Sequence, residues 1–86
     1  MRIWELDPNE FDEQLRDIRL DRRLTQKELA AKTASRENKI GSYERGFYTP
    51  TMDHLVAIAH ALGIDEIRID TSKLYKKKAW LKYRNR

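Results

Sequence analysis

The chain has 86 residues, no cysteine and a formal net charge of +4 at pH 7. We expect one small domain, residues 1–86, with a core too modest for a deep substrate cavity. Without cysteine there is no disulfide framework, thiolate metal site or thiol nucleophile. The N-terminal residues show no secretion signal and no apolar run reaches membrane-spanning length, so we expect a cytoplasmic protein with no membrane partner.

The positive charge is concentrated towards the C-terminal end. Residues 1–14 hold one cation against five acids, residues 15–70 hold ten cations and nine acids, and residues 71–86 hold seven cations and no acid. A basic tail of this kind predicts a polyanionic partner, with an attraction to phosphates that weakens steeply as salt rises. A purely solubilising tail is the alternative.

A first helix is predicted from residue 8 to residue 22. Asp7 suits the cap, Pro8 the first helical position, and Glu10 the closing of a capping box. Apolar residues then recur at helical spacing, namely Phe11, Leu15 and Ile18.

Residues 25–46 predict two short helices, 26–32 and 36–44, joined by a tight turn. Thr25 caps the first, with Glu28 at the capping-box spacing, and Gly46 ends the second. The outer face of the second helix carries polar side chains, namely Arg36, Glu37, Asn38, Lys39 and Ser42. A short helix that exposes donors, acceptors and cations on one side suits the major groove of DNA.

A fourth helix is predicted between Thr51, its cap, and Gly63, its stop. The residues expected to be buried are Met52, Leu55, Val56, Ile58, Ala59 and Leu62. Basic residues with leucine near helical spacing predict a further, C-terminal helix over residues 72–83.

Two segments, residues 2–5 and 67–70, alternate at period two and are candidate strands. Their pairing would give a two-stranded ribbon, either inside one protomer or between two. Irregular extended segments that merely cover the core are the alternative, because isolated two-stranded pairs are marginal.

These residues together resemble the helix-turn-helix domain of phage repressor and Cro proteins, also called the xenobiotic-response-element family. The matching residues are Leu15, Arg16, Arg19, Leu24, Thr25, Gln26, Leu29, Ala30, Ile40, Tyr43, Glu44, Arg45, Gly46, Pro50, Leu55, Ala59, Ala61, Leu62 and Gly63. The resemblance implies an all-α, lambda-repressor-like fold of four to five helices. It covers roughly residues 11–64 and also implies a homodimer on a palindromic DNA operator. We expect the helix-turn-helix core over residues 8–64 and a basic C-terminal extension over residues 65–86.

The resemblance assigns the DNA contacts to two helix starts. Gln26 matches the glutamine that lies against the DNA backbone, where a helix N-terminus suits phosphate. Asn38 and Glu37 match the start of the recognition helix, where Asn can pair with adenine and Glu can accept from cytosine. The expected DNA-binding residues are Thr25, Gln26, Lys27, Arg36, Glu37, Asn38, Lys39, Ser42, Arg45 and Tyr48.

The resemblance also pairs Arg19 with Glu44 in a structural ion pair rather than in a DNA contact. The chain departs from the family pattern at Ala34, where glycine is common in the turn, and at Gly41, inside the recognition helix. Gly41 serves either a close approach to DNA or close packing. A third departure is at residues 64–67, where a shortened segment replaces the usual fifth helix near the family's dimer surface.

Our leading hypothesis is a sequence-specific, dimeric repressor that reads double-stranded DNA with helix 36–44. The alternative is an antitoxin or adaptor, a protein-interaction module with secondary DNA binding. The acidic N-terminus and three aromatic candidates, Trp4, Trp80 and Tyr83, support that alternative unless these aromatics pack onto the core.

We expect neither an enzyme nor a metal or cofactor site. His54 and His60 are six residues apart, so they do not form a helical metal pair of the four-residue kind. The sequence shows no glycine-rich phosphate loop and no nucleophile arrangement.

Overall fold

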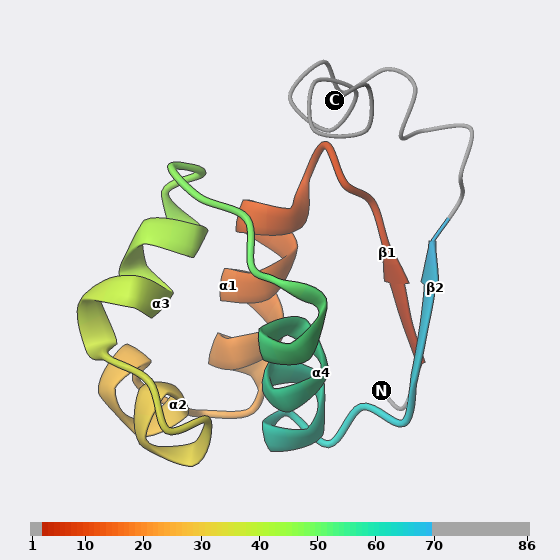
Figure 1. Ribbon diagram of the computed structural model, residues 1–86. Helices are drawn as coiled ribbons and strands as arrows, with labels where there is room; N and C mark the ends of the chain where they lie inside the picture. The colour runs from red at the N-terminus through yellow and green to blue at the C-terminus, as the bar shows by residue number, and fades with distance from the viewer. Residues whose placement is uncertain (1–2, 70–86) are drawn as a thin grey trace.

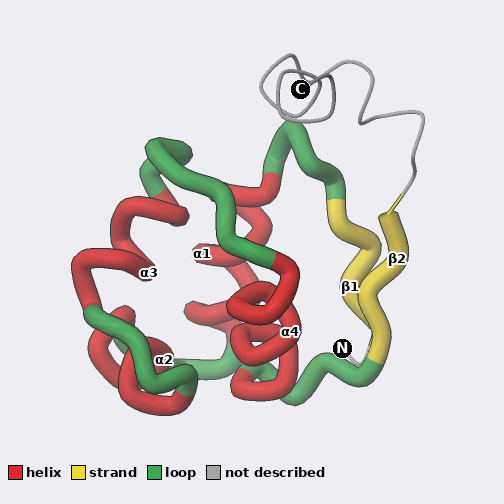
Figure 2. Tube along the Cα trace, viewed as in Figure 1, coloured by secondary structure: helices red, strands yellow, loops and turns green. Residues whose placement is uncertain are grey.

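The computed structural model describes residues 3–69, which form four helices and two short strands (Figure 1). In chain order they are β1 (Ile3–Leu6), α1 (Phe11–Asp21), α2 (Gln26–Lys32), α3 (Glu37–Glu44), α4 (Met52–Ala61) and β2 (Glu66–Ile69). Figure 2 shows the helices gathered together and the two strands side by side at one edge of them. This confirms the lambda-repressor-like helical class with a short ribbon. The C-terminal helix predicted over 72–83 lies outside the described residues.

Helix α1 begins at Phe11, so the predicted start at Pro8 was wrong. The Asp7 carboxylate accepts a hydrogen bond from the Asn9 N–H at 2.9 Å, and the Asp7 carbonyl accepts one from the Glu10 N–H at 2.9 Å. These bonds close a turn before the helix, and Glu10 occupies the cap position without a side-chain cap bond. An aspartate can satisfy either a cap or a local turn, and here the turn prevails.

All four described helices end in the same type of turn, a Schellman motif. The residue after each cap has a positive φ, namely Arg23 (58°), Ala34 (53°), Gly46 (77°) and Gly63 (75°). The next N–H then donates to the carbonyl five residues back, as Ser35 does to Ala30 at 2.9 Å. Ala34 therefore adopts the left-handed conformation that glycine tolerates best, at a cost of about 1–2 kcal/mol.

One apolar core joins the helices to the inner face of the ribbon. Its members are Trp4, Leu6, Phe11, Leu15, Ile18, Leu29, Ala30, Ile40, Tyr43, Leu55, Ile58, Ala59, Leu62 and Ile64. Trp4 is only 1% exposed and its ring stacks on that of Phe11, with the centroids 5.7 Å apart. Trp4 thus packs onto the core and is not an exposed anchor. The predicted burial of Met52 and Val56 was wrong, because these side chains are 64% and 44% exposed.

The two strands pair in parallel within one chain, with Ile3 opposite Glu66 and Leu6 opposite Ile69. The structure therefore selects the ribbon inside one protomer. Each strand lies one residue from its predicted position. The short segment that follows α4 leads directly into β2, which explains why no fifth helix follows α4 within residues 3–69. Burial of Trp4 and Leu6 against the helices gives this small sheet the support that an isolated pair lacks.

Candidate nucleic-acid interface

The start of α2 is held by a complete capping box, as the sequence predicted. The Thr25 hydroxyl accepts from the Glu28 N–H at 3.0 Å, and the Glu28 carboxylate accepts from the Thr25 N–H at 2.8 Å. The hydrogen bond from the Thr25 N–H, together with the Thr25 side chain, lowers the pKa of Glu28. Gln26 and Lys27 follow in the first turn, so their backbone position is fixed at the positive end of the helix dipole.

Helix α3 presents a row of polar side chains to solvent. Arg36, Glu37, Asn38 and Lys39 are all exposed, whereas Ile40 and Tyr43 on the other face are buried. Arg36 stands at the cap position, and no side chain caps the α3 amides. The start of α3 is therefore open to an anion as well as to base edges.

Ser42 differs from the other members of this row. It is half-buried, and its hydroxyl donates to the Asn38 carbonyl one turn earlier at 2.9 Å. Its proton is thus already used inside the helix, which leaves the oxygen as an acceptor.

A buried network joins α1, α2 and α3 behind this row. The Arg19 guanidinium donates to both Glu44 carboxylate oxygens, from Nε at 2.6 Å and from Nη2 at 2.9 Å. Arg19 Nη1 also donates to the Leu24 carbonyl at 2.7 Å, and Gln26 Nε2 donates to Glu44 Oε1 at 3.1 Å. The bond to Glu44 raises the pKa of Arg19. A bidentate pair in a buried place fixes direction as well as distance, so it sets how α3 lies on α1.

Gly41 of α3 faces the side chains of Arg45 and of Gln26 at the start of α2. A Cβ atom at this position would stand 3.2 Å from Arg45 Nη1 and 3.4 Å from Gln26 Oε1. Gly41 is buried within the protein. Of the two sequence interpretations, the structure favours close packing over an approach to DNA.

Two consecutive helices with a fixed angle and one exposed polar face are the elements of a helix-turn-helix unit. Residues 15–69 match the family model for the helix-turn-helix domain of the Cro/C1 type. The chain belongs to this family. Neither the curated proteins nor the solved structures yielded a match. The protein is thus a DNA-binding transcription regulator of the helix-turn-helix class.

In the loop after α3, the cationic side chain of Arg45 lies over the aromatic ring of Phe47. The Arg45 guanidinium carbon lies 5.3 Å from the centroid of the Phe47 ring. Phe47 and Tyr48 are 67% and 65% exposed, so both rings are open to solvent. Phe47 was not among the predicted site residues. Its signal in the sequence is a large apolar residue placed directly after the Gly46 stop.

A hollow beside the start of α3 is lined in part by residues that were not among the predicted DNA-binding residues. Thr33 and Ser35 line it together with His54 from α4. The Tyr43 hydroxyl lies 2.7 Å from His54 Nδ1, while His54 Nε2 is buried without a hydrogen-bond partner in residues 3–69. Burial, and secondarily Lys39, lowers the pKa of His54, so this ring is neutral at pH 7.

No helix within residues 3–69 has the length and apolar character needed to cross a bilayer. The same residues contain no cluster of three or more His, Cys, Asp or Glu side chains suited to a metal ion.

Proposed function

We propose that this helix-turn-helix protein is a repressor that binds a palindromic operator as a homodimer and reads its sequence with α3. The observation that carries the proposal is the exposed row from Arg36 to Lys39 on a helix whose other face is buried. The Arg19–Glu44 pair holds that helix from behind. Direct readout requires a row of donors and acceptors in a fixed position, and this arrangement supplies one.

Within the row each side chain suits a particular base edge. Asn38 is the candidate for bidentate pairing with adenine, Glu37 for accepting from the cytosine amino group, and Arg36 for guanine. Arg36 occupies the cap position, and Glu37 and Asn38 follow it at the start of α3, where a recognition helix first meets the bases. Ser42 offers only its oxygen, which favours an exocyclic amino group as its partner.

The remaining candidates are assigned to phosphates. Thr25, Gln26 and Lys27 lie at the capped start of α2, where the dipole and the side chains both favour an anion. Lys39 ends the exposed row, and Arg45 and Tyr48 follow α3, with Arg45 supported by the Phe47 ring. Phosphate contacts of this kind position a protein on DNA without reading its sequence.

The direct test compares Asn38→Ala with Lys27→Ala, because both side chains are exposed and neither belongs to the apolar core. Asn38→Ala should cost about 1–3 kcal/mol on the operator and relax the preference at one base pair. Lys27→Ala should weaken binding to all sequences alike and lower the salt slope by about one. If Asn38→Ala keeps both the affinity and the preference of the wild type, α3 does not read bases.

Dimeric binding would place two copies of α3 in successive major grooves, about 34 Å apart. A reporter assay decides the sign of regulation, because a repressor lowers and an activator raises expression from the bound promoter. We further propose that the chain acts as one domain with no catalytic activity and no cofactor, in the compartment that holds the DNA.

The antitoxin or adaptor hypothesis loses one of its three aromatic anchors, because Trp4 is 1% exposed. Trp80 and Tyr83 lie outside the described residues. A tight protein partner, found together with the absence of any footprint on DNA, would favour this second function over the first.

A further inference from the structure

We propose that the outer edge of β2 is the dimer interface, where β2 of a second copy adds in antiparallel orientation to form one four-stranded sheet. This inference deepens the dimeric part of the proposed function. It names the surface, the register and the residues that recognise the second copy.

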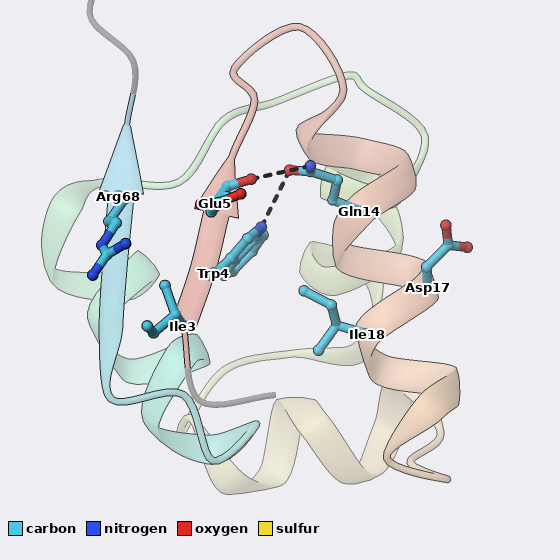
Figure 3. Close-up of a pocket in the computed structure, with 7 residues that line it drawn as sticks. All are labelled: Ile3, Trp4, Glu5, Gln14, Asp17, Ile18 and Arg68. Atoms are coloured by element: carbon cyan, nitrogen blue, oxygen red, sulfur yellow. Dashed lines mark hydrogen bonds between the residues drawn. The ribbon is translucent and has the colours of Figure 1, made fainter.

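The two edges of the small sheet are not equivalent. On β1 the Gln14 side chain closes the free edge, since its Oε1 accepts from the Asp7 N–H at 3.0 Å and its Nε2 donates to the Glu5 carbonyl at 3.3 Å. The same Oε1 accepts from the Trp4 indole at 3.1 Å, as Figure 3 shows for Trp4 and Glu5. Within residues 3–69, β2 has no third strand on its other side. An open strand edge is a ready template for pairing with another chain.

An apolar groove runs along this open edge, between β2 and α4. Its volume is about 250 Å³. Met52 and Val56 line it from the helix, and Ile67 and Ile69 line it from the strand. Met52 and Val56 are the α4 residues that sequence periodicity assigned to the core and that the single chain leaves 64% and 44% exposed. A second copy of β2 would cover both side chains with its own isoleucines.

The sequence of β2, Glu66-Ile67-Arg68-Ile69, is complementary to itself when one copy runs antiparallel to the other. With Ile67 on the two-fold axis, Glu66 stands opposite the second copy's Arg68, and Arg68 opposite the second copy's Glu66. Opposite charges in directly facing positions stabilise a strand pair, whereas like charges destabilise it.

The neighbouring strand continues this pattern across the sheet. Glu5 of β1 is paired in register with Arg68, and Trp4 with Ile67. One exposed row of the four-stranded sheet would therefore read Glu5, Arg68 and then the second copy's Glu66, with alternating sign. The neighbouring row, on the inner face of the sheet, would contain Trp4, Ile67 and the same two residues of the second copy, all of them apolar.

Other registers lack this match. A shift that places Arg68 or Glu66 on the axis brings two like charges face to face. A shift by one residue brings Ile67 opposite Arg68 and turns the apolar face of one copy towards the polar face of the other. The charge pattern thus selects a second copy of this strand, in one register, as the occupant of the edge.

The experiment measures the oligomeric state of the full chain by sedimentation equilibrium in the absence of DNA, so its outcome does not depend on operator binding. We expect a dimer for the wild type. Glu66→Arg and Arg68→Glu should each raise the dimer dissociation constant about tenfold or more, because each places like charges opposite one another twice. Glu13→Arg and Arg16→Glu change the same charges at exposed positions of α1 and should leave the dimer unchanged.

An equimolar mixture of Glu66→Arg and Arg68→Glu restores both opposite-charge pairs, so it should form a heterodimer with an affinity near that of the wild type. The double variant Glu66→Arg/Arg68→Glu should likewise regain a homodimer. Circular dichroism melts establish that each single variant is folded. A monomeric wild type, a dimer that tolerates both single variants, or a mixture that stays monomeric although both variants fold would overturn the proposal. The first of these results would show that another segment covers the edge.

Discussion

Glu44 holds α3 in its position relative to α1 and α2. Its side chain is 3% exposed and receives two hydrogen bonds from Arg19 and one from Gln26. Glu44→Ala leaves the Arg19 guanidinium buried without its counter-charge, so we expect a loss of about 3–5 kcal/mol in the free energy of unfolding, measured with urea.

The control for this prediction removes both charges together. The double variant Arg19→Met/Glu44→Leu should recover most of the lost stability, because no unpaired charge stays buried. Strict additivity of the two single variants would contradict the account, since residues in direct contact should show a coupling free energy.

His54 makes stability depend on pH near neutrality. Burial lowers its pKa below the ordinary 6.5, so the unfolded chain binds the proton more readily than the folded one. The stability is therefore fully present above about pH 6.5 and is lost as the pH falls towards the folded pKa. We expect the wild-type Tm to fall between about pH 7.5 and pH 5, and His54→Gln to flatten that fall. His60→Gln, at an exposed position, should keep the wild-type slope, and equal slopes for all three proteins would contradict this role for His54.

The structural role of a single residue was predictable where its local sequence pattern is compatible with only one structure. The Thr25–Glu28 capping box needs only its own four residues, and the structure contains it. Asp7 was assigned to a cap although it closes a turn, because both motifs use the same side chain at the same spacing. Trp4 could not be placed from sequence, since its burial depends on Phe11 and Gln14 of a helix that follows in the chain.

At the scale of the element, some helix ends were predictable from the sequence and others were not. Gly46 and Gly63 were predicted stops because glycine favours the left-handed conformation. Arg23 and Ala34 adopt that conformation too, although arginine and alanine do not favour it. What they share with the glycines is the hydrogen bond that closes the turn, and this bond exists only once the helix has formed.

Ala34 allows a test of whether the turn that ends α2 is strained. Ala34→Gly should raise the free energy of unfolding by about 1 kcal/mol, because glycine removes the left-handed strain and costs only part of that gain in the unfolded chain. Ala31→Gly, inside α2, is the matched control and should lower stability by about 1 kcal/mol. Both values follow from thermal or urea unfolding, and a destabilised Ala34→Gly would show that the turn is not strained.

Helix α4 shows where periodicity fails. Its apolar residues cover a wider arc than one chain buries, so Met52 and Val56 fit the pattern of the core and yet remain exposed. Periodicity reports which face is apolar but not what covers it. The exposed part of the arc lies on the groove beside β2, where we propose that the second copy binds.

At the scale of the whole molecule, the sequence predicted two strands but neither their orientation nor their partner. The strands are separated by all four described helices, and their parallel pairing follows from how α1 and α4 bring their ends together. The predicted site residues lie within one stretch from Thr25 to Tyr48, and the exposure of Arg36 to Lys39 could be predicted from the periodicity of α3 alone. His54 escaped prediction since it reaches the hollow from α4.

We expect the basic C-terminal segment to add a salt-dependent affinity for DNA. Deleting residues 73–86 removes seven cations, so affinity should fall for every DNA sequence and the plot of log affinity against log salt should become less steep by about 0.9 for each lost phosphate contact. Titrations of specific and random duplexes over a range of salt check this. An unchanged slope would assign the segment a solubilising role instead.

We propose above all that the exposed row on α3 reads a two-fold symmetric operator. The most direct measurement is selection of bound sequences from a random duplex pool at physiological salt, carried out in parallel with the wild type and Asn38→Ala. We predict a palindrome from the wild type, with half-sites about 34 Å apart, and the same palindrome from Asn38→Ala with one position in each half-site relaxed. Enrichment of no common sequence, or an identical motif from both proteins, would contradict the account.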